Sequence, residues 1–355
     1  MKNELIIVTV SLGNDGAERV LTLLANELIK DQYDVTIIQT KPGTYGNSYS
    51  FDKRIKVHDF SYHGEGGVLR YFSEAKQLRA FLKNKKNATL IAFLSQSMFV
   101  SVIAKIGLKN KLVVSERNDP RRCPAKRIQR IVRDICFYFA DACIFQTETV
   151  KHMFSKSIQK KSVVIPNPVN PALPDPFSGE RQHRIVTACR LHPQKNLEML
   201  LEAFSHFHKS FPDYTLDIYG TGVLEEKLKN YAATLDVSDS VVFHGFVTNL
   251  YAQIRTAMMY VCSSDYEGIS NSIIEAMALG IPTIATDCPI GGSSMLIQNG
   301  ENGLLVPVGD FEQMLQAMLK VAGSKELADH LSENAVKVRK TYDIDGIMKQ
   351  WEQVL

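Results

Sequence analysis

The chain has 355 residues, enough for about two domains of ordinary size. Hydrophobic residues make up 45% of it and charged residues 22%, which excludes a disordered chain, a collagen-like chain and a small disulfide-stabilised protein. The net charge of +3 is unevenly distributed, because residues 1–170 carry +12 and residues 171–355 carry −9. A basic half and an acidic half indicate two domains with different partners.

Short apolar runs alternate with helical patterns in the first half of the chain. We expect strands at residues 5–10, 34–40, 89–94, 111–115 and 142–146, and helices at residues 16–30, 70–86, 98–107 and 125–139. Apolar strands separated by helices are typical of a parallel sheet that is covered on both faces. The first half therefore predicts a doubly wound α/β domain of the Rossmann type.

Prolines then interrupt the pattern. Five of them fall within residues 166–176, which excludes a helix or a central strand there and predicts an interdomain linker. The alternation then resumes, with strands expected at 184–189, 215–219, 241–244, 258–262 and 283–286, and helices at 197–211, 224–235, 250–256, 272–279, 311–321, 325–341 and 344–355. We therefore expect a second Rossmann-like domain.

The apolar runs and the cysteines indicate the cellular compartment of the protein. No run approaches 18 apolar residues, so we expect no transmembrane helix, and residues 5–10 are too short for the core of a signal peptide. The cysteines show no metal-ligand spacing and are expected to be buried, reduced thiols; they stand at positions 123, 136, 143, 189, 262 and 288. These features favour a cytoplasmic protein without a metal site.

Three loops between a strand and a helix contain candidate ligand-binding residues. In the first, Gly13 and Gly16 flank a turn that leads into a helix. Backbone amides at such a helix N-terminus can approach a phosphate or a sugar. The same glycines would also fit a tight turn that binds nothing.

The second loop carries two cations. Arg190 ends a predicted strand, and Lys195 stands just before the next helix. Two fixed cations beside a helix N-terminus suit a diphosphate group. The alternative is a pair of ordinary surface cations.

The third loop follows the fourth strand of the second half and is the most informative. Glu267 lies on the loop, Gly268 permits a close backbone approach, and Ser270 or Asn271 can cap the following helix, in which Glu275 lies about one turn further on. Carboxylates accept hydrogen bonds from hydroxyl groups, so this loop can bind a sugar and a ribose while its amides bind phosphate. The alternative is a capped helix with two solvated glutamates.

These loops together resemble the retaining GT-B glycosyltransferases of family 4. The resemblance covers nearly the whole chain and rests on Glu267-x7-Glu275, Arg190-x4-Lys195, a near-match to Gly-Gly-Ala-Glu-Arg at 15–19, Gly220-x-Gly222, His244-Gly245-Phe246, Gly280-Ile-Pro282 and Asn302-Gly303-Leu-Leu-Val306. It implies two Rossmann-like domains that face a central cleft. Residues 1–168 would form the acceptor domain, residues 169–340 the nucleotide-sugar donor domain, and residues 341–355 a helix that packs back on the N-terminal domain.

The resemblance also implies a role for individual residues. Arg190 and Lys195 would hold the donor diphosphate and stabilise it as it leaves, Glu267 would contact hydroxyls of the donor sugar, and Glu275 would hold the ribose hydroxyls. The base would lie near residues 245–247. The donor-binding residues besides Glu275 would be Gly16, Gly245, Phe246, Val247, Gly268, Ile269, Ser270, Asn271 and Ser272.

The chain departs from the family pattern at three places, and these limit which family roles can be assigned to its residues. Asn14-Asp15 replaces the first glycine of the usual N-terminal pair, and Met295 stands where the family often has a glutamate. Many members carry a histidine in the loop after the strand at 111–115, where this chain has Ser-Glu-Arg-Asn-Asp. We therefore expect Glu116 or Arg117 to serve on the acceptor or sugar side.

Two predicted helices combine a basic stripe with an apolar one. Lys76, Arg79, Lys83 and Lys86 follow helical spacing on the first. On the second, cations including Arg127, Arg130 and Arg133 lie opposite an apolar face made of Ile128, Ile131, Ile135 and Phe139. Such helices suit docking of the basic face at an anionic membrane, and the alternative is packing on the core with a solvated basic face. No aromatic side chains accompany the cations as nucleic-acid binding requires, so no nucleic acid is expected.

The expected activity is that of a retaining, metal-independent hexosyltransferase without a cofactor. It would move a sugar from a nucleotide sugar, most simply a UDP-sugar, to a growing polyprenyl-diphosphate-linked glycan of a bacterial lipopolysaccharide or capsule, as a peripheral protein at the inner face of the cell membrane. A GDP-mannose-dependent mannosyltransferase and a non-catalytic GT-B-like scaffold at the membrane are the alternatives. An NAD-dependent oxidoreductase is disfavoured because Gly220-Thr-Gly222 lacks the third glycine of a dinucleotide-binding turn.

Overall fold

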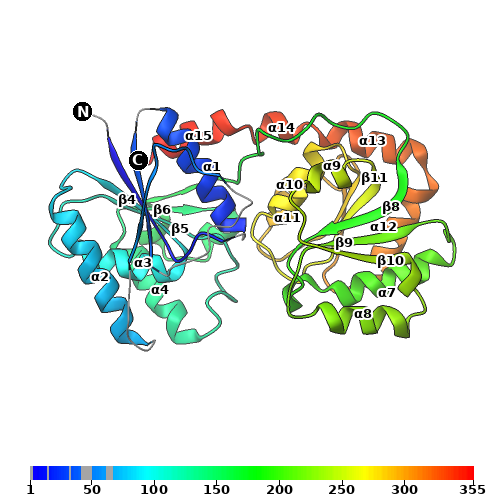
Figure 1. Ribbon diagram of the computed structural model, residues 1–355, viewed down its shortest axis with the longest axis horizontal. Helices are drawn as coiled ribbons and strands as arrows, with labels where there is room; N and C mark the ends of the chain where they lie inside the picture. Colours follow the sequence, from blue (N-terminus) through cyan, green and yellow to red (C-terminus); the bar gives the residue numbers. More distant parts are fainter. Residues whose placement is uncertain (1–2, 14–15, 32, 41–49, 61–66) are drawn as a thin grey trace. The chain divides into compact units, whose positions relative to one another are not determined.

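The computed structural model describes residues 3–13, 16–31, 33–40, 50–60 and 67–355. The chain forms two compact units, one made of Met1–Pro168 with Asp345–Leu355 and the other of Val169–Ile344 (Figure 1). The proline-rich residues 166–176 contain no helix or strand. Proline supplies no amide hydrogen to either element, so this agrees with the sequence.

The N-terminal unit is built on a seven-stranded parallel sheet. Its spatial order is β3 (Lys56–Asp59), β2 (Asp34–Gln39), β1 (Glu4–Thr9), β4 (Thr89–Phe93), β5 (Leu112–Ser115), β6 (Ala142–Phe145) and β7 (Ser162–Val164). The central strands are apolar on both sides, and Leu5, Ile6, Ile7 and Val8 of β1 are all buried. Continuous burial of this kind requires helices on both faces of the sheet.

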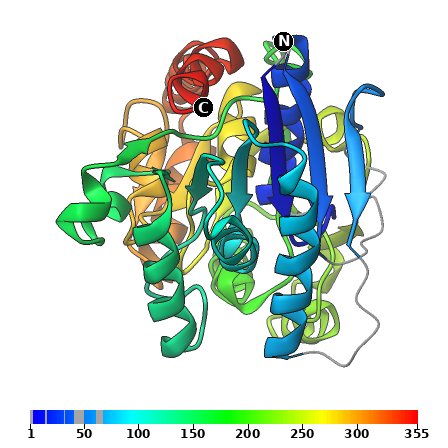
Figure 2. The same ribbon diagram turned by 90° about the vertical axis from the view of Figure 1, so that its left-hand side faces the viewer.

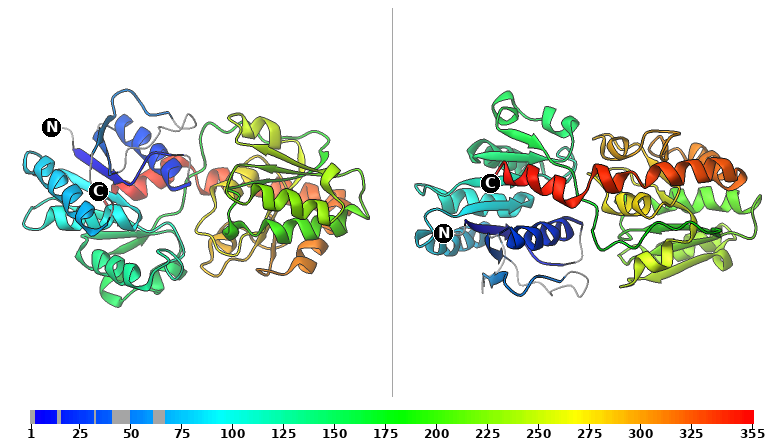
Figure 3. Two further views of the ribbon diagram at one scale, coloured as in Figure 1. Left: turned by 60° about the horizontal axis from the view of Figure 1, so that its bottom comes forward. Right: turned by 90° about the horizontal axis from the view of Figure 1, so that it is seen from above.

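Seven helices belong to the part of this unit that the structure describes, six of them from its long N-terminal segment. They are α1 (Gly16–Lys30), α2 (Val68–Lys83), α3 (Leu94–Lys105), α4 (Arg127–Phe139), α5 (Glu148–His152), α6 (Lys156–Gln159) and α15 (Ile344–Glu352). α3 packs between α2 and α4, and Figure 2 views the unit from the side on which α2 and α4 lie. α15, drawn in red in Figure 3, packs on this unit through the buried Trp351. The Trp351 ring stacks on the Phe93 ring, with 5.9 Å between the ring centroids.

The C-terminal unit is built on a six-stranded parallel sheet. Its spatial order is β10 (Val241–Gly245), β9 (Thr215–Tyr219), β8 (Gln182–Ala188), β11 (Ala257–Cys262), β12 (Thr283–Thr286) and β13 (Leu304–Val306). Successive residues of its strands enter two separate cores, as Ile185 and Val186 of β8 do. The sheet is therefore doubly wound, as the sequence predicts.

The helices of the C-terminal unit divide between those two cores. One core contains apolar side chains of α7 (Leu197–His208), α8 (Glu225–Thr234), α12 (Phe311–Gly323) and α13 (Lys325–Ala335). The other contains side chains of α9 (Leu250–Ile254), α10 (Asn271–Ala278), α11 (Gly292–Leu296) and α14 (Val338–Thr341). Two short 3-10 helices, η1 (Pro193–Lys195) and η2 (Ser238–Ser240), complete the unit.

The structure differs from the sequence predictions mainly in short elements. Strands β3, β7 and β13 have three or four residues each and were not predicted, and the helix expected at 325–341 is divided into α13 and α14. α3 begins at Leu94 rather than at residue 98, directly after β4 and with a positive φ of 70° at its first residue. Elements this short contain too few residues to display a period.

Candidate active site

The candidate site lies at the carboxyl ends of the strands in the C-terminal unit. β8 pairs with β9 on one side and with β11 on the other, so the order of the strands reverses between β8 and β11. Ligands of open α/β sheets bind beside the carboxyl ends of the strands at such a switch point. The loops that follow β8 and β11 carry the two most informative sequence patterns.

Asn196 holds the loop after β8 in place. It has the left-handed backbone conformation, with φ of 44°, and its side chain accepts a hydrogen bond from the amide of Met199 at 3.4 Å, which caps α7. Its side-chain nitrogen also donates to Asp265 on the loop after β11, at 2.7 Å. The last turn before α7 is therefore fixed at both ends, and Lys195 lies on it.

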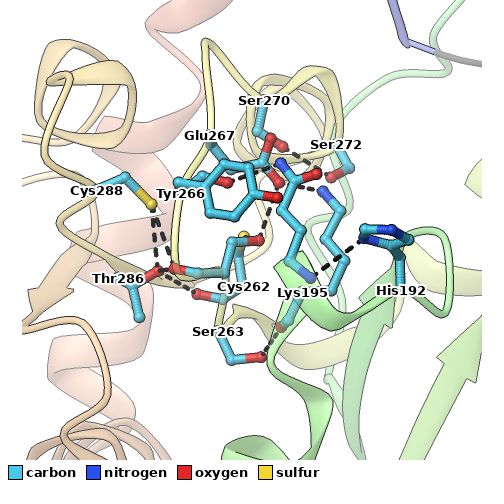
Figure 4. A network of polar contacts seen from close by, with 12 residues as sticks. His192, Lys195, Cys262, Ser263, Tyr266, Glu267, Ser270, Ser272, Thr286 and Cys288 are labelled. Carbon is cyan, nitrogen blue, oxygen red and sulfur yellow. Dashed lines mark hydrogen bonds and ion pairs between the residues drawn. The ribbon is translucent and has the colours of Figure 1, made fainter. Parts of the chain in front are cut away.

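Backbone and side-chain hydrogen bonds join the two loops. The amide of Asp265 donates to the carbonyl of Gln194 at 2.9 Å, and the Gln194 side chain donates to the carbonyl of Tyr266 at 2.8 Å. The hydroxyl of Ser263 donates to the carbonyl of Lys195 at 2.8 Å. These contacts, several of which Figure 4 shows, make one rigid platform of two segments about seventy residues apart in the chain.

Lys195 and Glu267 form an ion pair at the centre of this platform (Figure 4). Both side chains are largely buried, and the same Glu267 oxygen accepts a hydrogen bond from the hydroxyl of Ser264 at 2.9 Å. Burial disfavours the Lys195 charge, but the Glu267 carboxylate outweighs it, and the pKa of Lys195 lies above its usual value. The site therefore holds one permanent cation whose ammonium has further N–H donors for a ligand.

Further hydrogen bonds hold Ser264, the residue that donates to Glu267. The hydroxyl of Thr286, at the end of β12, donates to the carbonyl of Ser264 at 2.6 Å, and the thiol of Cys288 donates to the same carbonyl at 3.3 Å. Burial raises the pKa of Cys288 to about 12, so its thiol stays neutral. The roles of Ser264 and Thr286 were not predicted, because a single hydroxyl at the end of a strand has many possible partners.

Glycines allow the neighbouring loops to approach this platform. A Cβ atom on Gly220 would lie 1.9 Å from the carbonyl oxygen of Cys189, and one on Gly222 would lie 2.3 Å from that of Leu191. On the other side, a Cβ atom on Gly292 would lie 1.9 Å from the carbonyl oxygen of Gly268. Only glycine fits at these three positions, which explains the Gly220-x-Gly222 pattern in physical terms.

The residues predicted to line the sugar and the phosphates lie on the turn into α10. Gly268, Ile269 and Ser270 are buried on the loop, and Asn271 begins the helix. Ser270 occupies the N-cap position, but its hydroxyl contacts that of Ser272 at 3.1 Å rather than capping the helix. Tyr260 of β11 donates to the Ser272 hydroxyl at 2.8 Å and fixes its position. Glu275 is buried one turn further along α10.

The remaining predicted donor residues of this unit lie at the same edge of the sheet. Arg190 is exposed on the loop after β8. Gly245 ends β10 with φ of 65°, Phe246 is half exposed and Val247 packs on the core. β9 separates β10 from β8, so the base site predicted at residues 245–247 would be two strands away from Lys195.

Glu116, Arg117 and Gly16 belong to the N-terminal unit. Gly16 begins α1, and its predicted neighbours Asn14 and Asp15 lie outside the described residues. Glu116 is buried and accepts hydrogen bonds from the amides of Arg117 and Asn118 at 3.0 and 3.1 Å. Burial outweighs the nearby cation Arg133 and raises the pKa of Glu116 to about 7.

Arg117 is also buried, and the roles predicted for it and for Glu116 remain predictions. Its guanidinium donates to the side-chain oxygen of Asn167 at 2.9 Å and lies over the rings of Phe93 and Trp351, 5.3 and 5.5 Å from their centroids. Burial lowers the pKa of Arg117 to about 9. A guanidinium bound on both sides in this way is held in a fixed orientation.

The arginines predicted to face a membrane occupy three different environments on α4. Arg127 is exposed, but Arg130 is half-buried and donates to the carbonyls of Pro124 and Ala125 at 3.1 and 2.8 Å. Arg133 is only 4% exposed, so the prediction that it faces a membrane is wrong. The alternative, in which the apolar face packs on the core, is contradicted as well, because the apolar stripe is exposed.

The part of the chain that the structure describes contains neither a metal-binding cluster nor a membrane-spanning helix. Among the described residues, no group of three or more histidine, cysteine, aspartate or glutamate side chains is arranged to hold a metal ion. Within that same part of the chain, no helix is long and apolar enough to cross a bilayer.

Comparisons with known families identify the class of protein. The profile of "Glycosyl transferases group 1" matches residues 174–338, and that of "Glycosyltransferase Family 4" matches residues 14–173. The two matches divide the chain close to the boundary between its two units. The protein is a GT-B glycosyltransferase, and the chain belongs to family 4 of these enzymes.

Individual relatives agree with this assignment over their full length. The chain is 28% identical to an uncharacterized glycosyltransferase of Haemophilus influenzae, with 96% of each chain covered. It is also 28% identical to the GalNAc-α-(1→4)-GalNAc-α-(1→3)-diNAcBac-PP-undecaprenol α-1,4-N-acetyl-D-galactosaminyltransferase of Campylobacter jejuni, over 100% of this chain and 98% of that one. HepE of Anabaena, solved in complex with UDP-glucose, has the same fold, with a TM-score of 0.84 at 17% identity over 99% and 98% of the two chains.

Proposed function

We propose that the protein is a retaining hexosyltransferase that uses a nucleotide sugar, with a UDP-sugar as the donor. The acceptor is a growing glycan on a polyprenyl diphosphate, in the synthesis of a bacterial surface polysaccharide. The C-terminal unit binds the donor and the N-terminal unit binds the acceptor. The reaction breaks the bond between the anomeric carbon and the diphosphate, joins that carbon to an acceptor hydroxyl oxygen, and releases the nucleoside diphosphate and a proton.

The Lys195–Glu267 pair at the switch point between β8 and β11 is the observation that supports this proposal most strongly. Negative charge develops on the diphosphate as the sugar leaves, and a fixed cation stabilises that charge where it forms. The carboxylate of Glu267 is an acceptor for the sugar hydroxyls and stands next to the cation that would bind the phosphate. One platform thus supplies both functions that the reaction needs.

The cation at the platform also bears on whether the reaction needs a metal ion. A divalent ion in other enzymes neutralises the charge of a leaving phosphate group. Lys195 supplies a permanent positive charge at this position, and Arg190 at the edge of the same loop supplies a second. We therefore propose that the reaction needs no metal ion and no cofactor.

Two comparisons support the finer parts of the proposal. The relative from Campylobacter acts, by its name, on a glycan linked to undecaprenyl diphosphate, and HepE was solved with UDP-glucose. A lipid-linked acceptor resides in the membrane. We therefore propose that the protein is a cytoplasmic, peripheral protein that binds at the inner face of the cell membrane.

The experiment that tests this proposal is a donor panel. Purified protein is incubated with radiolabelled UDP-sugars and with GDP-mannose, each with a short-chain polyprenyl-diphosphate glycan, and the anomeric configuration of the product is determined. The proposal predicts transfer from a UDP-sugar with retention. Transfer from GDP-mannose alone would establish a mannosyltransferase instead. Nucleotide binding without transfer from any donor would favour a non-catalytic scaffold.

A further inference from the structure

The outer face of α4 exposes a continuous apolar stripe. It consists of Ile128, Ile131, Ile135, Tyr138 and Phe139, each between 48% and 65% exposed. The spacing of these residues places them on one side of the helix. Large apolar side chains scattered singly over a surface are ordinary, but five on adjacent turns of one helix form a patch that requires a partner.

Arginines on the inner side of α4 hold the stripe in this orientation. Arg133 donates to the carbonyls of Pro120 and Cys123, both at 2.7 Å, and pairs with Asp134 at 2.9 Å. Rotating the helix to bury the stripe would break the two hydrogen bonds to the Pro120 and Cys123 carbonyls, which lie outside the helix. Hydrogen bonds from a charged donor contribute about 1.5–3 kcal/mol each, so exposure of the stripe is a stable property of the fold.

Positive charge surrounds the end of the helix where the stripe begins. Arg121, Arg122, Lys126 and Arg127 are all exposed there, and Arg121 is paired with the buried Asp119 at 3.0 Å. Asp134 is the single acidic residue of α4, and its carboxylate is already paired with Arg133. An apolar stripe beside exposed cations is complementary to an anionic lipid surface, which offers acyl chains below a layer of negative headgroups.

We propose that the apolar stripe of α4 inserts into the headgroup region of an anionic lipid bilayer while Lys126 and Arg127 contact the lipid phosphates. The inference deepens the proposed peripheral location, on which it rests for its purpose. It names a hydrophobic contact surface where the sequence indicated an electrostatic one. The helix lies along the bilayer plane, because an interfacial helix needs only one apolar face.

Charge favours a bilayer over a second copy of the chain as the partner of the stripe. A second α4 would offer the neighbouring cations no free carboxylate, because Asp134 is the single acidic residue of the helix and is paired with Arg133. An anionic bilayer presents negative headgroups to those cations, and each apolar side chain that enters it contributes separately. The stripe and its cations therefore fit an anionic lipid surface.

Vesicle flotation tests the proposal directly. Full-length protein is mixed with vesicles of phosphatidylethanolamine and phosphatidylglycerol, and the variant Ile131→Ser/Ile135→Ser is compared with the wild type. We expect at least about a tenfold loss of partitioning, because each isoleucine loses its contact with the acyl region. The matched control, Val223→Ser/Val242→Ser, removes two exposed apolar side chains of the C-terminal unit and should bind as the wild type does.

A fluorescence measurement locates the contact independently. The chain has one tryptophan, Trp351, which is fully buried, so a tryptophan at position 135 can be distinguished from it. Emission of Ile135→Trp should be quenched by brominated lipids, and that of Val223→Trp should not. Lys126→Ser/Arg127→Ser should retain the quenching but bind about tenfold or more weakly at low salt.

Three results would overturn the proposal. They are equal partitioning of the isoleucine double variant and the wild type, absence of wild-type binding to anionic vesicles at low salt, and a concentration-dependent dimer that the double variant abolishes without any vesicle binding. Transfer to a water-soluble acceptor analogue, measured in parallel, separates this outcome from failure of the proposed function. The isoleucine variant should retain that transfer, because α4 contributes no residue to the donor platform.

Discussion

Replacing Lys195 by alanine should affect both stability and turnover, and the two effects can be separated. The substitution leaves the largely buried Glu267 carboxylate without its cation. Breaking a buried ion pair on one side costs about 3–5 kcal/mol, and the Ser264 hydroxyl that remains at 2.9 Å offsets part of this, so we expect a loss of about 2 kcal/mol. Turnover should fall by about 10²-fold, because the cation at the leaving group is lost.

The double variant Lys195→Ala/Glu267→Gln distinguishes the two effects. It removes the uncompensated charge, so it should regain at least about half of the lost unfolding free energy, yet it should stay as inactive as the single variant. Lys229→Ala is the matched control, because its pair with Glu225 is exposed and should contribute little to stability. The assays are urea unfolding and turnover of labelled donor. Unchanged stability of Lys195→Ala would show that Glu267 does not need the cation, and turnover within threefold of the wild type would show that Lys195 does not stabilise the leaving group.

Three further predictions follow from other parts of the structure. Burial raises the pKa of Glu116 to about 7, so the folded state binds that proton more tightly and the wild type should lose stability as pH rises from about 4 to about 8. Glu116→Gln should lack that loss, becoming more stable than the wild type by about 1–3 kcal/mol at pH 8 in thermal unfolding, and a constant difference across pH would argue against it. Gly220→Ala should lower the unfolding midpoint sharply and weaken nucleotide binding, since its Cβ would overlap the Cys189 carbonyl; normal stability would mean that the loop moves freely. Transfer should persist in excess EDTA, and loss of activity that magnesium or manganese restores would show that a metal is required.

The sequence predicted the doubly wound sheets well, because their central strands are apolar and long enough to show a pattern. β1 and β8 were placed to within two residues at either end. Edge strands such as β3 and β13 were missed, since they have only four and three residues. Contacts between loop residues are harder to predict than strands. Lys195 and Glu267 are far apart in the sequence, and the pairing of β8 with β11 brings them together.

The orientation of α4 shows where helical periodicity fails. The pattern correctly predicts an amphipathic helix, but it does not say which face turns inward. The carbonyls of Pro120 and Cys123 decide this, because they lie where the Arg133 guanidinium can bind them. That information depends on the path of a loop whose conformation no local pattern encodes. The helical pattern alone therefore cannot predict that Arg133 is buried while the apolar stripe is exposed.

We propose that the platform between β8 and β11 binds the donor diphosphate. Titration calorimetry of UDP and of uridine measures this binding in the wild type and in Arg190→Ala/Lys195→Ala. We expect the variant to bind UDP at least about 10²-fold more weakly, because each lost cation contributes more than 1 kcal/mol, while uridine binding is unchanged. Equal affinity of the two proteins for UDP would show that the two cations do not hold the diphosphate.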